Sequence, residues 1–274
     1  ASDTATIVSS GSLTIDGKGS VENSGTAPAL MNQEYGILTV AGSAAVAKST
    51  DGNVIVNHGD MRLMENSTVN GTNASSLVLN GWPTSGLNMK KAAADLTIDG
   101  AVLTGGTYNV ENSYYGRLDI ISGNFSVNTK GSILNLDQAT IENGIFDAGS
   151  GAVLTNSVLP ETQYSKPVYA KAEMTVNNGK FNGKIMNSDT ATLQVYGGYF
   201  SDDPAGYLGF GIATNTLTGN APYNYQAVRA ELKVEGTTAD PKVVEPDTWG
   251  KDTATVNAIT TITDTLSTNK PQAE

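Results

Sequence analysis

The residues best suited to acid and base chemistry are one pair of adjacent carboxylates, Asp202 and Asp203, and the only histidine, His58. Paired carboxylates can divide the roles of acid and base when their surroundings separate their pKa values. Asp202, however, stands in a turn sequence that leads into Pro204, which favours an Asx turn or a helix N-cap. His58 lies in Asn57-His58-Gly59, which is typical of a turn histidine. We therefore predict no catalytic residue.

Exposed aromatic side chains are the second kind of candidate, because they stack on sugar rings without catalysing anything. Trp82 follows Gly81 and precedes a proline, and Tyr114 and Tyr115 occupy a turn between two strand-like segments. The same side chains could instead anchor loops by packing against the protein. Both interpretations remain open, and Trp82, Tyr114 and Tyr115 are the candidate ligand-binding residues.

Composition excludes several functions. The 27 acidic residues against 16 basic ones give a net charge of -11, which disfavours nucleic acid and anionic membranes as partners. The absence of cysteine removes disulfides, thiolate nucleophiles and cysteine-based metal sites, so we predict neither a metal nor a cofactor. No apolar run approaches the roughly 20 residues of a membrane span. The acidic, Thr-rich composition favours an extracellular or surface-attached location.

One short repeat unit positions these residues along the chain. Leu96-Thr97-Ile98-Asp99-Gly100 is identical to the five residues at 13–17. Leu96 and Ile98 alternate with Thr97 and Asp99, so both aliphatic side chains point to one face of a strand. Gly100 tolerates a positive φ, and we expect it to end the strand in a sharp turn. Related units close at Gly42, Gly71, Gly81, Gly123, Gly144, Gly179 and Gly197.

The spacing of these units predicts a solenoid. Intervals of 21 to 29 residues separate the closing glycines Gly17, Gly42, Gly71, Gly100, Gly123 and Gly144. Each interval has room for two or three short strands and contains no helical pattern, which is what a parallel β-helix requires. Stacking at about 4.8 Å would give roughly nine or ten coils. Insertions, which project as loops in a solenoid, are expected near residues 25–35, 82–91 and 159–169.

The repeat ends near residue 200. We predict coils over residues 1–200, then a C-terminal cap over 201–235 whose final strand runs from Tyr225 to Val234. Residues 236–274 are rich in Thr, Asp and Pro and are predicted to be a linker or tail. A weakly amphipathic helix is the alternative there, because apolar residues recur at Val256, Ile259 and Ile262.

The repeat units, followed by Gly-Gly-x-Phe-Ser-x-Asp-Pro at 197–204, resemble the right-handed parallel β-helix, or pectin-lyase-like, regions of bacterial cell-surface, adhesin-like proteins. The resemblance covers about residues 6–235, and the sequence departs from the pattern after Tyr207. It implies a single-stranded right-handed parallel β-helix that acts as a non-catalytic structural or adhesive module displaying variable loops. Glycans or cell-surface proteins would be the partners. The alternative is a polysaccharide-binding or polysaccharide-degrading β-helix protein, because the same fold carries lyases and hydrolases.

Overall fold

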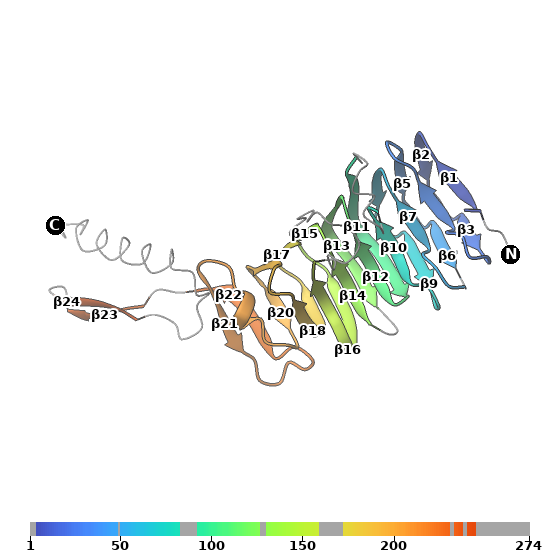
Figure 1. Cartoon of the computed structure of the whole chain (residues 1–274). Coiled ribbons are helices and arrows are strands. Elements are labelled where there is room, and N and C mark those ends of the chain that lie inside the picture. The colour runs from blue at the N-terminus through green and yellow to red at the C-terminus, as the bar shows by residue number, and fades with distance from the viewer. Residues whose placement is uncertain are drawn as a thin grey trace, which may run out of the picture.

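The computed structural model describes residues 4–48, 50–82, 92–126, 130–158, 172–230, 233–237 and 240–244. Twenty-two strands form one continuous hydrogen-bonded sheet, which winds into a parallel β-solenoid of about seven turns. Figure 1 shows the turns stacked from the N-terminal end, in blue, to the C-terminal end, in orange. The predicted fold class is confirmed, whereas the expected nine or ten coils were too many.

Each turn contributes strands to three faces, which we call faces A, B and C. Face A consists of β1 (Ile7–Ser9), β4 (Leu30–Asn32), β7 (Ile55–Asn57), β10 (Ser76–Asn80), β12 (Tyr108–Asn112), β14 (Gly131–Asn135) and the second halves of β16 (Ile145–Asn156) and β18 (Lys180–Asn187). All its neighbouring strands are parallel, so side chains at the same register form columns along the solenoid.

Face B follows face A in every turn. It consists of β2 (Ser12–Ile15), β5 (Ile37–Val40), β8 (Asp60–Leu63), the first halves of β11 (Ala94–Gly105) and β13 (Gly116–Ser126), then β15 (Gln138–Ile141), β17 (Glu173–Val176) and β19 (Thr192–Val195). Leu96 and Ile98 point inward here and are buried, as predicted. Their columns continue through Leu38 and Val40 in β5 and through Leu118 and Ile120 in β13.

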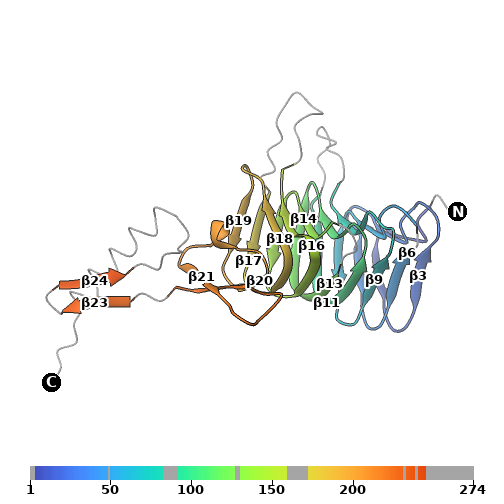
Figure 2. The ribbon, with the colours of Figure 1, turned by 90° about the horizontal axis from the view of Figure 1, so that it is seen from below.

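Face C completes each turn. It consists of β3 (Ser20–Asn23), β6 (Ala45–Lys48), β9 (Thr68–Gly71), the second halves of β11 and β13, the first halves of β16 and β18, and β20 (Gly198–Phe200). In Figure 2, β3, β6 and β9 lie side by side at the N-terminal end.

Gly100 forms the corner between faces B and C. Its φ of 84° confirms the predicted need for glycine, and an added Cβ would lie 3.0 Å from Cα of Glu65. The expectation that the strand ends there is wrong, because β11 continues from Ala94 to Gly105 through a register shift between Ile98 and Ala101. A bulge of this kind bends a strand while keeping most of its hydrogen bonds.

A column of asparagines runs along the interior at the end of face A. Each Nδ2 donates to Oδ1 of the asparagine in the next turn over 2.7–2.8 Å, which gives six consecutive side-chain bonds. The donors also reach backbone carbonyls of the adjoining corner, as Asn112 does to Gly116 and Gln138. We call this column the asparagine ladder: Asn32, Asn57, Asn80, Asn112, Asn135, Asn156 and Asn187.

A column of phenylalanines occupies face C toward the C-terminal end. The rings of Phe125, Phe146, Phe181 and Phe200 stack with centroids 4.5, 4.8 and 4.8 Å apart and planes within 10° of parallel. Each follows a glycine of positive φ by two positions, and at Gly144 an added Cβ would lie 2.7 Å from the ring of Phe146. We call these four residues the phenylalanine column.

The C-terminal end is closed by antiparallel strands. β22 (Tyr225–Arg229) pairs with β20 on one side and with β21 (Ile212–Thr216) on the other, after a 3-10 turn at Ala205–Tyr207. The predicted final strand begins at Tyr225 as expected but ends at Arg229, before the predicted end at Val234. The chain instead leaves β22 at Arg229 and forms a separate pair, β23 (Lys233–Thr237) with β24 (Asp240–Val244). The rest of the predicted tail, including the helical alternative, lies outside the described residues.

Two of the three predicted insertions lie at the same corner. Between faces A and B, Asn57 is followed by β8 at Asp60, whereas Asn80 is followed by β11 only at Ala94 and Asn156 by β17 only at Glu173. Positions 83–91 and 159–171 of these two connections lie outside the described residues. The insertion expected at 25–35 is wrong, because this segment contains β4 and its corner is packed against the buried Lys48, whose Nζ donates to Gly25 O.

Candidate functional site

The turns that follow the asparagine ladder carry a group of aromatic rings at the corner between faces A and B. His58 comes directly after Asn57, and its ring stacks on that of Trp82 with centroids 3.8 Å apart and an interplanar angle of 10°. We define Tyr35, His58, Trp82, Tyr114 and Tyr115 as the aromatic corner. Tyr35, in the turn after Asn32, is 80% exposed, whereas Trp82 and the other two tyrosines are half-buried.

Backbone contacts join the predicted residues to one another. The N–H of Trp82 donates to the carbonyl of Tyr114 over 2.9 Å, and Ser113 Oγ donates to the carbonyl of Trp82 over the same distance. The structure therefore brings Trp82 and Tyr114 together from adjacent turns, which are 32 positions apart in the sequence. His58 lies in the turn that the sequence predicted, and it gains a role as the stacking partner of Trp82.

Tyr115 is held in an unusual backbone conformation. Its φ of 57° is in the left-handed region, which is uncommon for residues other than glycine. Its N–H donates to Oδ2 of Asp137 in the next turn over 2.9 Å, and its carbonyl accepts from Ala94 in the preceding turn over 2.8 Å. The turn is thereby fixed from both neighbouring coils.

The carboxyl group of Asp137 is partly shielded from water. Burial raises its pKa above the usual aspartate range, and the nearby Glu173 acts in the same direction. The hydrogen bond from Tyr115 and the charge of Arg117 oppose that rise. Asp137 is therefore a structural acceptor that protonates at a higher pH than an exposed aspartate would.

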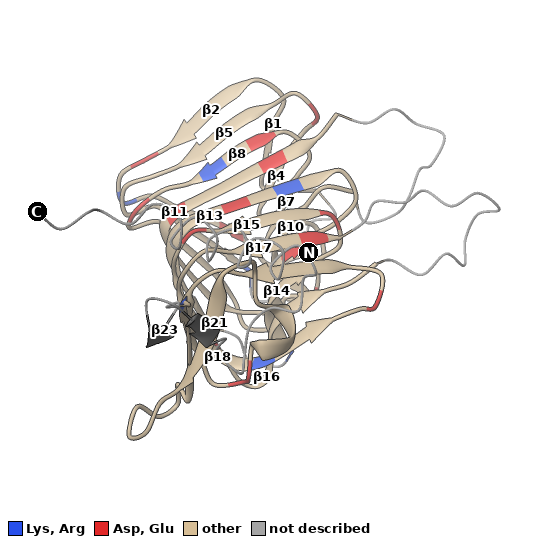
Figure 3. Ribbon diagram, turned by 90° about the vertical axis from the view of Figure 1, so that its left-hand side faces the viewer, with Lys and Arg blue, Asp and Glu red and all other residues tan. Residues whose placement is uncertain are grey.

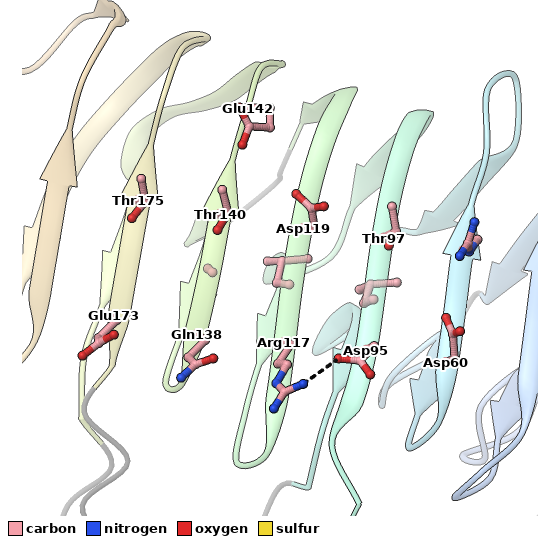
Figure 4. A pocket seen from close by; sticks show the side chains of 14 residues that line it. Asp60, Asp95, Thr97, Arg117, Asp119, Gln138, Thr140, Glu142, Glu173 and Thr175 are labelled. Atoms are coloured by element: carbon pink, nitrogen blue, oxygen red, sulfur yellow. Dashed lines mark ion pairs between the residues drawn. The ribbon is translucent and has the colours of Figure 1, made fainter.

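An open groove of about 800 Å³ lies on the outer surface of face B, beside this corner (Figure 4). Its floor is built from residues of β8, β11, β13, β15 and β17 that alternate with the buried aliphatic columns. Five carboxylates and two guanidinium groups line it, from Asp60, Asp95, Asp119, Glu142, Glu173, Arg62 and Arg117.

The charges of the groove are spread along it. The one ion pair among the groove residues drawn in Figure 4 joins Arg117 to Asp95 at 4.0 Å, and both side chains are at least half exposed, so it stabilises the fold little. Burial raises the pKa of Asp119, with Glu142 in the next turn adding to the rise. Figure 3 shows charged residues dispersed over several turns of the described chain. Among the described residues, no three His, Cys, Asp or Glu side chains converge on a possible metal position.

The adjacent aspartates of the cap have structural partners. Asp202 Oδ2 accepts from the N–H of Ile185 over 2.8 Å, and Asp203 Oδ1 accepts from the N–H of Ala205 over 3.0 Å. The Asx turn predicted for Asp202 is thus made by Asp203, which is the residue directly before Pro204. Asp202 instead ties the cap to β18.

Sequence reasoning missed Asp137, the groove and the asparagine ladder. The ladder has a readable signal, because an aliphatic residue stands two positions before each of its asparagines, as in Leu30-Met31-Asn32 and Ile133-Leu134-Asn135. Asp137 has no such signal, since its contact with Tyr115 depends on how adjacent turns are aligned.

Comparisons with family models, with curated proteins and with solved structures found no significant match to this chain. Within the described residues, no helix has the length and apolar character needed to cross a membrane. Fold and local geometry are therefore the basis for considering function.

Proposed function

We propose that this protein is a non-catalytic structural and adhesive module of an extracellular, bacterial surface-attached protein, and that the corner between faces A and B is its contact edge. The observation that carries the proposal is that the aromatic corner and the two longest connections occur at this same edge. Aromatic rings and chain insertions are the usual means by which a solenoid contacts a partner, while its coils supply the spacing.

The interior of the described coils supports a rigid scaffold. The asparagine ladder satisfies amide groups that would otherwise be unpaired in the core, and the aliphatic columns fill the space between the faces. A rod of this kind holds its contact edge in a fixed geometry, which lowers the entropic cost of binding.

The partner class that best fits the edge is a glycan. The aromatic corner provides rings for stacking, and the adjacent groove provides carboxylates, guanidinium groups and threonine hydroxyls for hydrogen bonds with sugar hydroxyls. A protein on a cell surface is the alternative partner. A glycan array probed with the whole chain tests this, with Trp82→Ala expected to abolish the signal.

Phe210→Ala is the matched control, because Phe210 is also a large aromatic residue and is 51% exposed, but it belongs to the cap. Retained binding in this variant together with loss in Trp82→Ala would support the aromatic corner as the contact. Equal binding signals for Trp82→Ala and the parent protein would contradict the role of the aromatic corner in binding.

Polysaccharide cleavage is the second candidate, and one observation favours it. Asp119 and Glu142 are carboxylates on adjacent turns of the groove, and their interaction helps to raise the pKa of Asp119. Two carboxylates on adjacent turns can supply an acid and a base to a substrate that lies across them. If a depolymerisation assay released reducing or unsaturated ends that disappeared in Asp119→Asn and Glu142→Gln, the protein would be an enzyme and the non-catalytic proposal would be wrong.

A further inference from the structure

Resting on the proposed contact role of the aromatic corner, we propose that Asp137 is the positioning residue of that corner and makes it acid-sensitive. The carboxylate would hold the Tyr114-Tyr115 turn in its binding geometry at neutral pH and release it when protonated. The consequence is a contact edge that weakens in a mildly acidic environment while the solenoid stays folded.

The turn at Tyr115 is strained. Tyr115 adopts a left-handed conformation without the freedom of glycine, and such residues persist only where surrounding contacts fix them. The contacts here are the bond from Tyr115 N–H to Asp137 Oδ2, the bond from Ala94 N–H to Tyr115 O, and the turn bond from Gly116 N–H to Ser113 O. The first of these is the one supplied by an ionisable side chain.

Hydrogen bonds connect this turn to the other rings. The carbonyl of Tyr114 accepts from Trp82 N–H, and Ser113 Oγ returns a bond to Trp82 O, so the two segments are held together in both directions. Trp82 in turn stacks on His58. A displacement of the Tyr115 backbone therefore also moves Tyr114, whose carbonyl is bonded to Trp82.

Charged groups act on Asp137 in opposite directions. The groups that act on it are Arg117 in β13, which favours the carboxylate, and Glu173 in β17, which disfavours it, together with burial and the Tyr115 bond. Because the balance raises the pKa, protonation begins above the usual aspartate range near 3.9. Protonation also replaces a charge-assisted hydrogen bond with a neutral one of roughly half the strength.

The expected pH effects on the corner and on the whole fold have opposite signs. A carboxyl group whose folded pKa is raised binds its proton more readily in the folded state than in the unfolded state. Its titration therefore makes the folded protein relatively more stable as pH falls, while the bond to Tyr115 weakens. Local release of the corner and acid unfolding can consequently be separated by experiment.

Tryptophan fluorescence can report the corner directly. The chain has two tryptophans, so Trp249→Phe leaves Trp82 as the only emitter. We expect the Trp82 emission of the Trp249→Phe variant to shift to longer wavelength between pH 7 and pH 4 as the corner loosens. Its far-UV circular dichroism should stay unchanged. Any emission change that does not depend on Asp137 would be common to all variants, so each variant is compared with Trp249→Phe at the same pH.

Variants at Asp137 decide the outcome. In Asp137→Asn the amide oxygen still accepts from Tyr115 but does not titrate, so the neutral emission should persist and the acidic shift should be lost. Asp137→Ala should show the shifted emission at every pH. The control is Asp119→Asn, which changes a groove carboxylate whose pKa is also raised and should keep the acidic shift. An acidic shift in Asp137→Asn as large as that in Trp249→Phe would overturn the proposal, as would unchanged emission of Asp137→Ala at neutral pH.

This experiment contains no ligand, so its result is independent of the proposed function. If the acidic shift is lost in Asp137→Asn but the glycan array and cell-surface protein screens detect no partner for the parent protein, the positioning role stands and the contact function fails. Binding abolished by Trp82→Ala but equal at pH 7 and pH 4 would keep the contact function and overturn the acid-sensitivity of the edge.

Discussion

The asparagine ladder and the phenylalanine column use the same repeat geometry with opposite chemistry. Both place one residue type at one register position in consecutive turns, so that like side chains stack along the solenoid. The amides gain directional hydrogen bonds and also bind carbonyls of the corner. The rings gain only contact area and stacking, and they need glycines of positive φ beside them.

The difference shows how a solenoid fixes a corner and how it fills a face. At the A-to-B corner, the backbone leaves the sheet and its carbonyls need donors, so a short polar side chain is favoured. On face C one inward column begins with Val21, Val46, Val69 and Leu103 and ends with the four phenylalanines. Side-chain size varies along that column, whereas every residue of the ladder is asparagine.

The largest effect is expected from breaking the middle of the ladder. Asn112→Leu removes the donor to Asn135 Oδ1 and to the carbonyls of Gly116 and Gln138. Leaving about three buried polar groups unpaired should cost roughly 5 kcal/mol of unfolding free energy. Urea denaturation measures this loss of unfolding free energy, and Asn70→Leu is the control at an exposed asparagine. Equal losses in the two variants would contradict the role of the ladder.

A somewhat smaller loss is expected from the phenylalanine column. Phe146 is fully buried between two stacked rings, and Phe146→Ala should cost about 3–5 kcal/mol through the cavity that it leaves. Phe146→Leu should recover part of this loss, because Leu103 shows that the position tolerates an aliphatic residue. Thermal unfolding compares the two variants. A larger loss for Phe146→Ala than for Asn112→Leu would reverse the comparison.

Extending the ladder should stabilise the protein modestly. Asn32 Oδ1 is buried and has no hydrogen-bond partner, and the residue opposite it in the first turn is Ser9. Ser9→Asn would place an Nδ2 donor there and should add about 1 kcal/mol. The measurement is the urea midpoint against Ser10→Asn, which changes the exposed neighbour. A lower midpoint for Ser9→Asn would show that the ladder cannot continue into the first turn.

The smallest effect is expected outside both columns, at the repeat unit itself. Asp99 Oδ1 accepts from Ser122 Oγ over 3.0 Å, and asparagine can accept in the same way. Asp99→Asn should therefore change stability by less than about 0.5 kcal/mol. Ile98→Asp, which buries a charge in the fully enclosed column beside it, should unfold the local coil. Similar melting curves for the two variants would show that Asp99 contributes as much to the stability of the repeat as Ile98 does.

Much of the fold follows from local sequence. The alternation at Leu96 and Ile98 predicted buried columns, and Gly100 predicted a corner with positive φ. The corner did not end the strand, because a bulge allows the hydrogen bonding of β11 to continue. The turn count was overestimated in part because the units that close at Gly81 and Gly100 belong to the same coil, on faces A and B.

The candidate site was predictable only in part. Trp82, Tyr114 and Tyr115 were recognisable as turn aromatics, and their role in binding stays a prediction. That Trp82 would stack on His58 and pair with Tyr114 was not predictable, because connections between turns vary in length. Ladder asparagines, for example, are between 21 and 32 residues apart.

The inward direction of the aliphatic side chains follows from the sequence alone, because side-chain direction in a strand alternates with each residue whatever the neighbouring strands do. The sequence also determined where the chain turns, through the glycines. Which turns align, and thus which asparagines bond, which rings stack and which carboxylate holds Tyr115, depends on the three-dimensional fold. Register between turns depends on the length and packing of every connection, and that information is shared across the whole chain.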